Sequence, residues 1–417
     1  MLFEQYGVSP EMCALDLEIM AQCAEQFAQC EQVRDITQLR VLKAFADNRV
    51  GMQHFAASTG YGYGDTGRDT LDAVFAQSVG AEDALCRSHL LSGTHALTVA
   101  LFGLLRAGDT LLAATGRPYD TLLPVIGITE DEENYGSLMQ YGVKYDEVPL
   151  VNGEPDLEGI RAKAADATVV HIQRSRGYEP RRAFSVDDIR AISDSVKSVN
   201  PNAVIFVDNC YGEFCDISEP CSNGADLMAG SLIKNAGGGI APTGGYIAGR
   251  ADLVERCAHR LTAPGTGREL GSTPGGLRDY YLGLYFAPQI TCEAKKSSIY
   301  AAALFEKLGF GAVPSYDAPR NDIITSLHME SAEQLIALCC AVQASSPVDS
   351  FAAPVPDDMP GYADKVIMAA GAFTQGSSIE LSCDAPLREP YIAYLQGGLN
   401  LVNVRLACLR AAEAIRK

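Results

Sequence analysis

Residues 203–209 read AVIFVDN, a run of five apolar residues followed by an aspartate and an asparagine. A short, unbroken apolar run of this kind predicts a strand buried on both faces, which is typical of a parallel sheet covered by helices. The flanking sequence extends the pattern, because strand-like runs alternate with amphipathic helical stretches. Further strands are expected at 110–114, 143–150, 167–173, near 227 and at 245–248, and helices at 94–106, 156–164 and 185–199. We therefore predict a doubly wound α/β domain with a mostly parallel sheet.

The rest of the chain predicts an N-terminal arm and a second, smaller domain. Residues 9–45 have helical spacing of apolar side chains, and the glycine-rich segment 58–69, STGYGYGDTGRD, reads as a loop. After the Gly/Pro-rich stretch 263–276 we expect helices at 280–308, 332–343 and 399–415, with strands at 322–328, 366–370 and 378–382. The predicted domains are an arm (1–57), a large domain (58–290) and a small α+β domain (291–417).

Composition argues against several kinds of partner. The chain of 417 residues carries 33 Lys and Arg against 52 Asp and Glu, a net charge of −19, which disfavours binding to nucleic acid or an anionic membrane. No stretch approaches the roughly 18 apolar residues of a membrane helix. The thirteen cysteines are scattered and odd in number, which predicts reduced thiols and a cytoplasmic location. The acidic run at 130–133 is interpreted as a solvated loop, and no metal site is expected.

Asp208 is the first candidate site residue, because it follows the buried strand directly. A carboxylate at the carboxyl end of such a strand lies at the sheet edge where ligands bind in open α/β folds. A role as a turn or helix-capping residue is an equal alternative. A P-loop enzyme is excluded, because the chain has no G-x-x-x-x-G-K-[ST] motif.

Lys234 is the second candidate. It is one of only ten lysines, it ends an apolar segment, and three glycines follow at 237–239. Burial lowers the pKa of a lysine and makes its neutral, nucleophilic amine accessible, as a Schiff-base lysine requires. A lysine that extends from a strand end into solvent is the structural alternative.

The segment Ser92-Gly93-Thr94 opens a predicted helix, whose free amides suit a phosphate, although Ser92 or Thr94 could equally be a simple cap. Together the candidates have a recognisable order: a phosphate-binding helix start, an aromatic residue (Tyr119), an acid at a strand end (Asp208), then a lysine. Pyridoxal phosphate needs these parts, because it requires a covalently bound lysine, an acid for its ring nitrogen and a phosphate anchor.

At these residues the chain resembles the fold type I pyridoxal phosphate enzymes, specifically the Cys/Met metabolism group of cystathionine lyases and methionine gamma-lyase. Within that group it is most similar to the methionine gamma-lyase-like, or aluminium resistance, family. The similar segments are RSHLLSGTHAL (87–97), HIQRSRGY (171–178), VDNCYGEF (207–214), SLIKNAGGGIAPTGGYIAG (231–249) and REPYIAYLQGGL (388–399).

The resemblance implies roles around the cofactor. Lys234 would hold pyridoxal phosphate covalently and later move the substrate α-proton, while Asp208 would pair with the ring nitrogen. Gly93 and Thr94 would donate amides to the phosphate, and Ser231 would add a hydroxyl.

The resemblance also implies a stacking residue and contacts between subunits. Tyr119 would stack on the cofactor ring and act as a second acid or base. Tyr63 and Arg68 resemble the arm that reaches into a neighbouring subunit's phosphate site, so the resemblance implies a homodimer or homotetramer.

The implied activity is a lyase that eliminates a thiol from a sulfur-containing amino acid, by β- or γ-elimination, to give a 2-oxo acid and ammonia. The substrate carboxylate needs an arginine, because its two parallel N–H groups match a carboxylate. Arg388 is the first choice and Arg405 the second, and Arg174 or Arg176 could share the task. An aminotransferase or another α-carbon lyase would keep Lys234 and Asp208, and a non-catalytic cofactor-binding protein of metal tolerance is the other alternative.

Overall fold

The computed structural model describes residues 2–128, 135–179, 181–358 and 364–416. Its contacts divide the chain into two compact units. The large unit is Ile36–Phe286, and the small unit combines Met1–Asp35 with Ala287–Lys417. The arm, large domain and small domain expected from sequence stay predictions. The acidic run at 130–133 lies outside the described residues.

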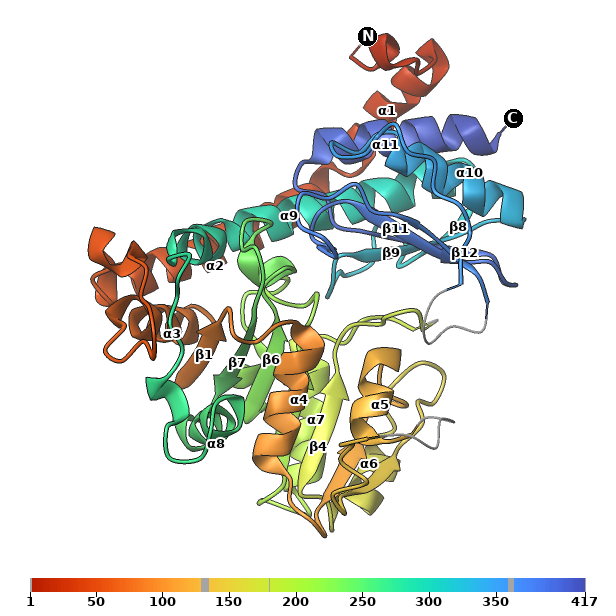
Figure 1. Ribbon diagram of the computed structural model, residues 1–417. Coiled ribbons are helices and arrows are strands. Elements are labelled where there is room, and N and C mark those ends of the chain that lie inside the picture. Colours follow the sequence, from red (N-terminus) through yellow and green to blue (C-terminus); the bar gives the residue numbers. More distant parts are fainter. Residues whose placement is uncertain (1, 129–134, 180, 359–363, 417) are drawn as a thin grey trace. The chain divides into compact units, whose positions relative to one another are not determined.

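The described residues of the large unit form a seven-stranded sheet in the order β1-β7-β6-β5-β4-β2-β3 (Figure 1). All neighbouring pairs are parallel except those that β7 makes with β1 and β6. The mostly parallel sheet predicted from sequence is therefore confirmed. The strands are β1 (Asp83–Arg87), β2 (Thr110–Ala113), β3 (Lys144–Glu147), β4 (Val169–Gln173), β5 (Val204–Asp208), β6 (Leu227–Ser231) and β7 (Gly245–Gly249).

Strand β5 forms at the apolar run that decided the fold, and four of its five residues are buried. Because β4, β5 and β6 are parallel, their carboxyl ends lie at one edge of the sheet. The register places Gln173 beside Asp208 and Asp208 beside Ala229. This edge therefore receives the side chains that follow each strand.

Helices of the large unit begin at recognisable caps. Ser92 caps α4 by accepting a hydrogen bond from the His95 amide, and Ser185 and Asp188 form a capping box at α7. Helices α4 and α8 pack together, and both lie on β7 (Figure 1). The helices are α3 (Thr66–Ser78), α4 (Gly93–Leu104), α5 (Leu123–Ile126), α6 (Leu157–Ala164), α7 (Val186–Lys197) and α8 (Ala251–Leu261).

The described residues of the small unit form an antiparallel five-stranded sheet in the order β10-β11-β12-β9-β8. Its strands are β8 (Gly311–Val313), β9 (Ile324–His328), β10 (Val366–Ala369), β11 (Ser382–Pro386) and β12 (Ile392–Gln396). Its helices are α1 (Pro10–Gln22), α10 (Ala332–Gln343) and α11 (Leu401–Ile415). Helices α2 (Ala24–Asp47) and α9 (Arg278–Lys307) run from one unit into the other along the chain.

Two sequence predictions for the small unit were wrong. The strand expected at 378–382 begins at Ser382 instead, because alternating Ile379 and Leu381 imitate a strand whereas the real one reads SCDAP. Strands β8 and β12 were missed, although all five residues of β12 are buried.

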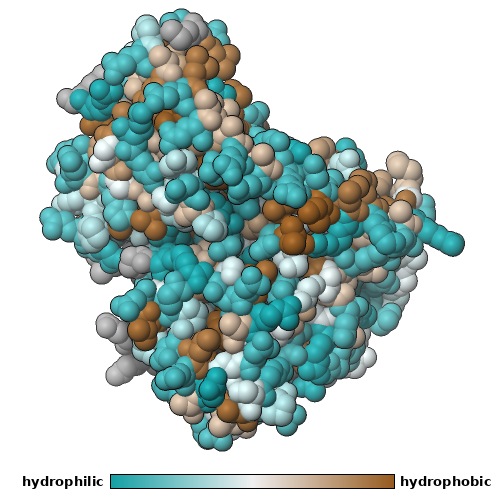
Figure 2. Space-filling model, turned by 180° about the vertical axis from the view of Figure 1, so that it is seen from behind, coloured by the Kyte–Doolittle hydropathy of each residue, from teal (hydrophilic) through white to brown (hydrophobic). Residues whose placement is uncertain are grey.

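The face shown in Figure 2 is mainly hydrophilic, with apolar side chains in small groups. Each of the thirteen cysteines is a free thiol. Among the described residues, we find no helix with the length and apolar character needed to cross a bilayer.

Candidate functional site

Three elements of the large unit meet beside the carboxyl end of β5. Asp208 ends β5, Ser231 ends β6, and Gly93 starts α4 directly against Ser231. A Cβ added to Gly93 would lie 3.3 Å from the Ser231 Cβ and 3.2 Å from the Cys210 Sγ. The structure therefore brings together the acid, the hydroxyl and the helix start that the sequence singled out.

Asp208 is 8% exposed, and its Oδ1 accepts a hydrogen bond of 3.1 Å from the Cys210 amide. The turn role considered as an alternative is thus present alongside the position at the sheet edge. His171, on the neighbouring strand β4, is also buried, and burial lowers the pKa of its ring to about 4 while Asp208 acts in the opposite direction. His171 is therefore neutral at pH 7, and its Nε2 has no hydrogen-bond partner among the described residues.

The start of α4 is a suitable anion site. Ser92 uses its hydroxyl to cap the His95 amide, while Gly93 and Thr94 contribute the first amides of the helix. The Thr94 hydroxyl lies 3.0 Å from that of Thr121. Because Gly93 has no side chain, this end of the helix can approach Ser231 closely.

Lys234 follows β6 and has a partly buried side chain. Its Nζ lies 3.9 Å from the centre of the Tyr211 ring. Burial acts to lower the pKa of Lys234, but the nearby Cys210 and Tyr211 raise it more, so the pKa lies above its usual value. Asp208 and Glu213 act in the same direction. The expectation of a lowered Lys234 pKa was therefore wrong, because the acidic groups around the amine outweigh the effect of burial.

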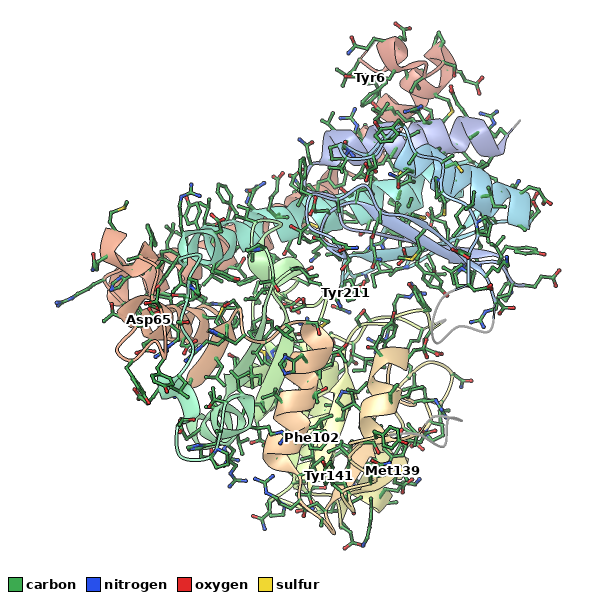
Figure 3. The ribbon with its side chains drawn as sticks, in the orientation of Figure 1. Tyr6, Asp65, Phe102, Met139, Tyr141 and Tyr211 are labelled. Carbon is green, nitrogen blue, oxygen red and sulfur yellow. The ribbon has the colours of Figure 1, made fainter. Side chains whose placement is uncertain are left out.

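Tyr211, labelled in Figure 3, lies in the loop after β5 and was missed by the sequence analysis. Its φ of +70° is unusual for a residue with a side chain, and Phe214 in the same loop has a φ of +58°. The side-chain amide of the buried Asn235 donates through Nδ2 to the carbonyl oxygens of Tyr211, at 2.9 Å, and Glu213, at 3.1 Å. The residue next to Lys234 therefore fixes the loop that faces Lys234.

Arg174 holds the loop after β5 in place. It is fully buried, and its Nη1 donates to the Asn209 Oδ1 at 2.8 Å and to the Gly212 carbonyl at 2.9 Å. A Cβ at Gly212 would lie 2.6 Å from the Arg174 Cδ, so only glycine allows this approach. Glu219, also fully buried, lies 3.7 Å from the guanidinium and accepts the Phe214 amide at 2.7 Å. The Arg174 Nη2 has no hydrogen-bond partner within the described residues, but the whole guanidinium is buried under the loop.

Glu213 is a second residue that the sequence analysis missed. It is fully buried, its Oε1 accepts from the Tyr246 hydroxyl at 2.8 Å, and its Oε2 has no hydrogen-bond partner in the described chain. Burial raises the pKa of Glu213 to about 8. The absence of a side chain at Gly230 makes room for this pair, because a Cβ there would lie 2.6 Å from Oε1. An acid five positions after the aspartate that ends the buried strand was the available signal.

Tyr119 lies at the start of a short helical segment, where its amide donates to the Gln173 Oε1 at 2.7 Å. A Cβ at Gly177 would lie 3.0 Å from the Tyr119 ring, and the ring of Tyr178 is centred 6.0 Å away. Tyr119 is therefore held by the segment that follows β4, and its expected stacking on the cofactor stays a prediction.

The glycine-rich loop places its two candidates differently. Tyr63 is 65% exposed, whereas Arg68 is 1% exposed. The Arg68 guanidinium donates to the carbonyls of Gly62 and Gly271, each at 3.0 Å. Arg68 thus holds its own loop together, and Tyr63 is the member of the pair whose side chain reaches solvent.

The other two arginine candidates belong to the small unit. Arg388 is exposed and lies 3.4 Å from the Asp364 carboxylate. Arg405 lies on α11, is 12% exposed, and donates through Nε at 2.8 Å and through Nη2 to the buried Asp16. Arg405 is therefore occupied by a buried ion pair rather than lying on the surface.

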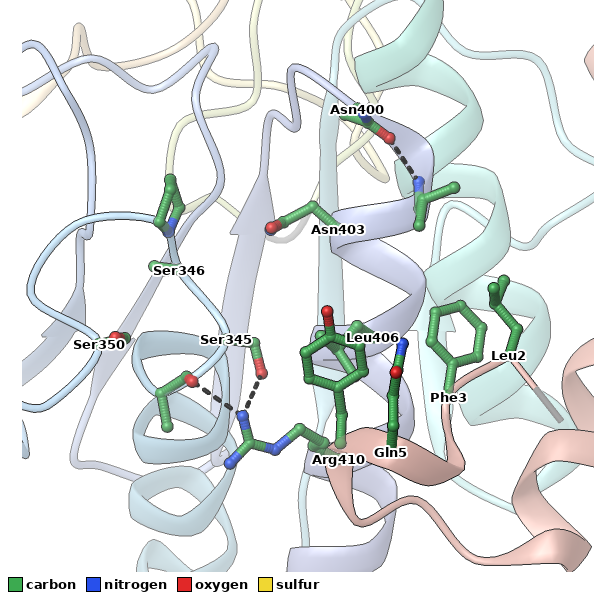
Figure 4. Close-up of a pocket in the computed structure, with 14 residues that line it drawn as sticks. Leu2, Phe3, Gln5, Ser345, Ser346, Ser350, Asn400, Asn403, Leu406 and Arg410 are labelled. Carbon is green, nitrogen blue, oxygen red and sulfur yellow. Dashed lines mark hydrogen bonds between the residues drawn. The ribbon is translucent and has the colours of Figure 1, made fainter.

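A separate pocket of about 530 Å³ lies within the small unit (Figure 4). It is lined by residues of the N-terminus, α11 and the segment after α10, and Arg410 donates there to the Ala344 carbonyl at 2.8 Å and the Ser345 hydroxyl at 3.2 Å. None of the predicted site residues is among the residues that line it.

The mostly parallel sheet, the smaller antiparallel sheet and the site at the strand ends define a protein of the fold type I pyridoxal phosphate class. A family model described as methionine gamma-lyase matches residues 13–416, and the chain belongs to that family.

Two similar proteins match nearly the whole chain, and a third shares only its fold. The Bacillus subtilis protein YnbB is 46% identical over 401 residues, which are 96% of this chain and 95% of YnbB. The structure of a carbon-sulfur lyase involved in aluminum resistance from Clostridium novyi NT is 49% identical with a TM-score of 0.94, covering 98% of this chain and 97% of the other. The pyridoxal-5'-phosphate dependent protein YhfS from Escherichia coli shares the fold, at 17% identity and a TM-score of 0.63, covering 92% and 97%.

The family implies pyridoxal phosphate, and the residues at the strand ends fit this cofactor. Gly93 approaches Ser231 so closely that a Cβ would disturb the contact, and this puts the first amides of α4 beside the Ser231 side chain, as a phosphate site requires. Lys234 supplies a partly exposed amine without a carboxylate bound to it, and Asp208 supplies an acid for a ring nitrogen.

Proposed function

We propose that this protein is a pyridoxal phosphate-dependent carbon–sulfur lyase. The reaction would convert a sulfur-containing amino acid and water into a thiol, a 2-oxo acid and ammonia. The observation that carries the proposal is the meeting of Lys234, Asp208 and the start of α4 at one edge of the sheet. Each supplies one requirement of the cofactor.

The roles of the residues follow from their chemistry. The bound cofactor accepts the electron pair left at the substrate α-carbon when its proton is removed. The Lys234 amine would hold the cofactor and then move the α-proton, while the Asp208 carboxylate would stabilise a proton on the ring nitrogen. The amides of Gly93 and Thr94 and the Ser231 hydroxyl would bind the phosphate.

Three further parts of the proposal concern the cofactor ring, the substrate and the assembly. Tyr119 would stack on the cofactor ring and serve as a second acid or base. Arg388 would bind the substrate carboxylate, because Arg405 is paired with Asp16 and Arg174 is buried under the loop. Tyr63 would contact a neighbouring subunit in a homodimer or homotetramer.

The test is to incubate the purified protein with cystathionine, cysteine and methionine and to measure free thiol and 2-oxo acid. The proposal predicts both products in equal amounts from at least one substrate, and none from the Lys234→Ala variant. A 2-oxo acid formed without thiol would indicate an aminotransferase, and no product from any of the three would contradict the proposal.

A further inference from the structure

The Lys234 amine contacts an aromatic ring, although several acidic groups lie near it. Within the described residues, the ring of Tyr211 is the partner of Nζ, at 3.9 Å from its centre, and no carboxylate lies within 4 Å. A cation over an aromatic face is attracted by the negative charge density of the ring. Tyr211 therefore attracts the charged amine without forming a salt bridge to it.

The position of the Tyr211 ring is set by contacts that also include the neighbour of Lys234. Asn235 is fully buried, and its side-chain Nδ2 donates to the carbonyl oxygens on both sides of Gly212, those of Tyr211 and Glu213. The backbone of Tyr211 is held at a φ of +70°, a conformation that costs free energy and persists only where surrounding contacts enforce it. A loop held in this way keeps the ring at a constant distance from Lys234.

The other groups facing the amine do not replace the ring. Cys210, Asp208 and Glu213 contribute to the electrostatic field at Lys234. Glu213 accepts a hydrogen bond from Tyr246 on β7, the strand beside β6, and Asp208 accepts one from the Cys210 backbone amide. These groups act on the pKa of Lys234 from a distance, whereas the Tyr211 ring contacts the amine.

We propose that the face of Tyr211 is the resting place of the Lys234 ammonium whenever that amine is not covalently bound to the cofactor, an inference that rests on the proposed function. Tyr211 is then a positioning residue. It keeps the amine charged and close to the site, and the weak, non-ionic contact lets the amine leave the ring to move a proton or to rejoin the cofactor. A carboxylate at the same place would hold the ammonium as an ion pair and oppose that departure.

The test measures the pKa of Lys234 in the full-length chain after the cofactor has been removed with hydroxylamine. The rate at which acetic anhydride labels Lys234 is followed against pH by peptide mass spectrometry. Tyr211→Leu is expected to lower the pKa of Lys234 by about one pH unit, the size of a desolvated cation–π contact. Tyr211→Phe keeps the ring and is expected to restore the wild-type pKa to within about 0.3 unit.

Phe214→Leu is the matched control, because Phe214 lies in the same loop with the same backbone handedness, and within the described residues the cation–π contact of Lys234 is with Tyr211. An unchanged pKa in Tyr211→Leu, or an equal drop in Phe214→Leu, would overturn the inference. A drop in Tyr211→Phe as large as in Tyr211→Leu would also overturn it, since the hydroxyl and not the ring would then be responsible. Failure of the proposed function is distinguishable, because it appears as missing lyase activity in the wild-type protein whatever the pKa of Lys234.

Discussion

Replacing Glu213 with glutamine should change how the stability of the large unit depends on pH. Glu213 is fully buried, and burial raises its pKa to about 8 from the usual 4.5. Between these two values the folded protein holds a proton that the unfolded chain has lost. The free energy of unfolding of the wild-type protein therefore contains a contribution that is complete below pH 4.5 and is lost as the pH rises to 8.

The size of this contribution follows from the two pKa values. A difference from 4.5 to about 8 corresponds to roughly 5 kcal/mol, at about 1.36 kcal/mol for each pH unit. Glutamine keeps the shape and the oxygen that accepts from Tyr246 but carries no titrating proton. The stability of Glu213→Gln relative to wild type should therefore rise by several kcal/mol between pH 5 and pH 8 and then stay level.

The assay is thermal unfolding of both proteins in steps from pH 5 to pH 9. For a unit of this size the expected change in the Tm difference is about 10 °C. Glu158→Gln, at an exposed glutamate of α6, is the matched control and should show no such trend. A Tm difference that stays constant or shrinks between pH 5 and pH 8 would refute the reasoning, since Glu213 would then be ionised in the folded protein.

Three further predictions concern the cofactor, the small unit and the substrate. A Cβ at Gly93 or at Gly103 of the same helix would meet its neighbours at 3.2 Å, but only Gly93 lies at the proposed phosphate site. Gly93→Ala should therefore weaken cofactor binding about tenfold in a fluorescence titration, whereas Gly103→Ala should not. Equal losses in the two variants would contradict this prediction. Asp16→Asn leaves Arg405 without its charged partner and should destabilise the small unit by about 3–5 kcal/mol in calorimetry, whereas an unchanged transition would show that the pair contributes little. Arg388→Gln should raise the KM for an amino-acid substrate about tenfold with little change in kcat, and an unaltered KM would remove Arg388 from the substrate site.

Much of the large unit could be predicted from sequence because its signals are local. The buried run that ends at Asp208, the cap at Ser92 and the apolar helix after it each determine their own segment, and the structure places them as expected. The true bounds of β11 could not be predicted in this way, because this strand carries Asp384, which is buried and paired with Gln396 only once the sheet has formed. Strand β12 reads IAYLQ, a local signal that the sequence analysis overlooked.

The candidate site divides along the same line. Lys234 and Asp208 could be found because each follows an apolar run, and a functional residue at a strand end is visible in sequence. The contact of Lys234 with Tyr211 could not, because it depends on a left-handed backbone held by Asn235. The raised pKa of Lys234 was missed for the same reason, since burial is readable from sequence whereas the surrounding acids come together only in the fold.

The most direct measurement of the central claim is to locate the lysine that binds the cofactor. The protein loaded with pyridoxal phosphate is reduced with borohydride, digested and analysed by mass spectrometry. The account predicts one modified peptide, with the pyridoxyl group on Lys234, and loss of the visible absorbance band on reduction. Modification of a different lysine, or an unmodified Lys234 in protein that retains the band, would contradict it.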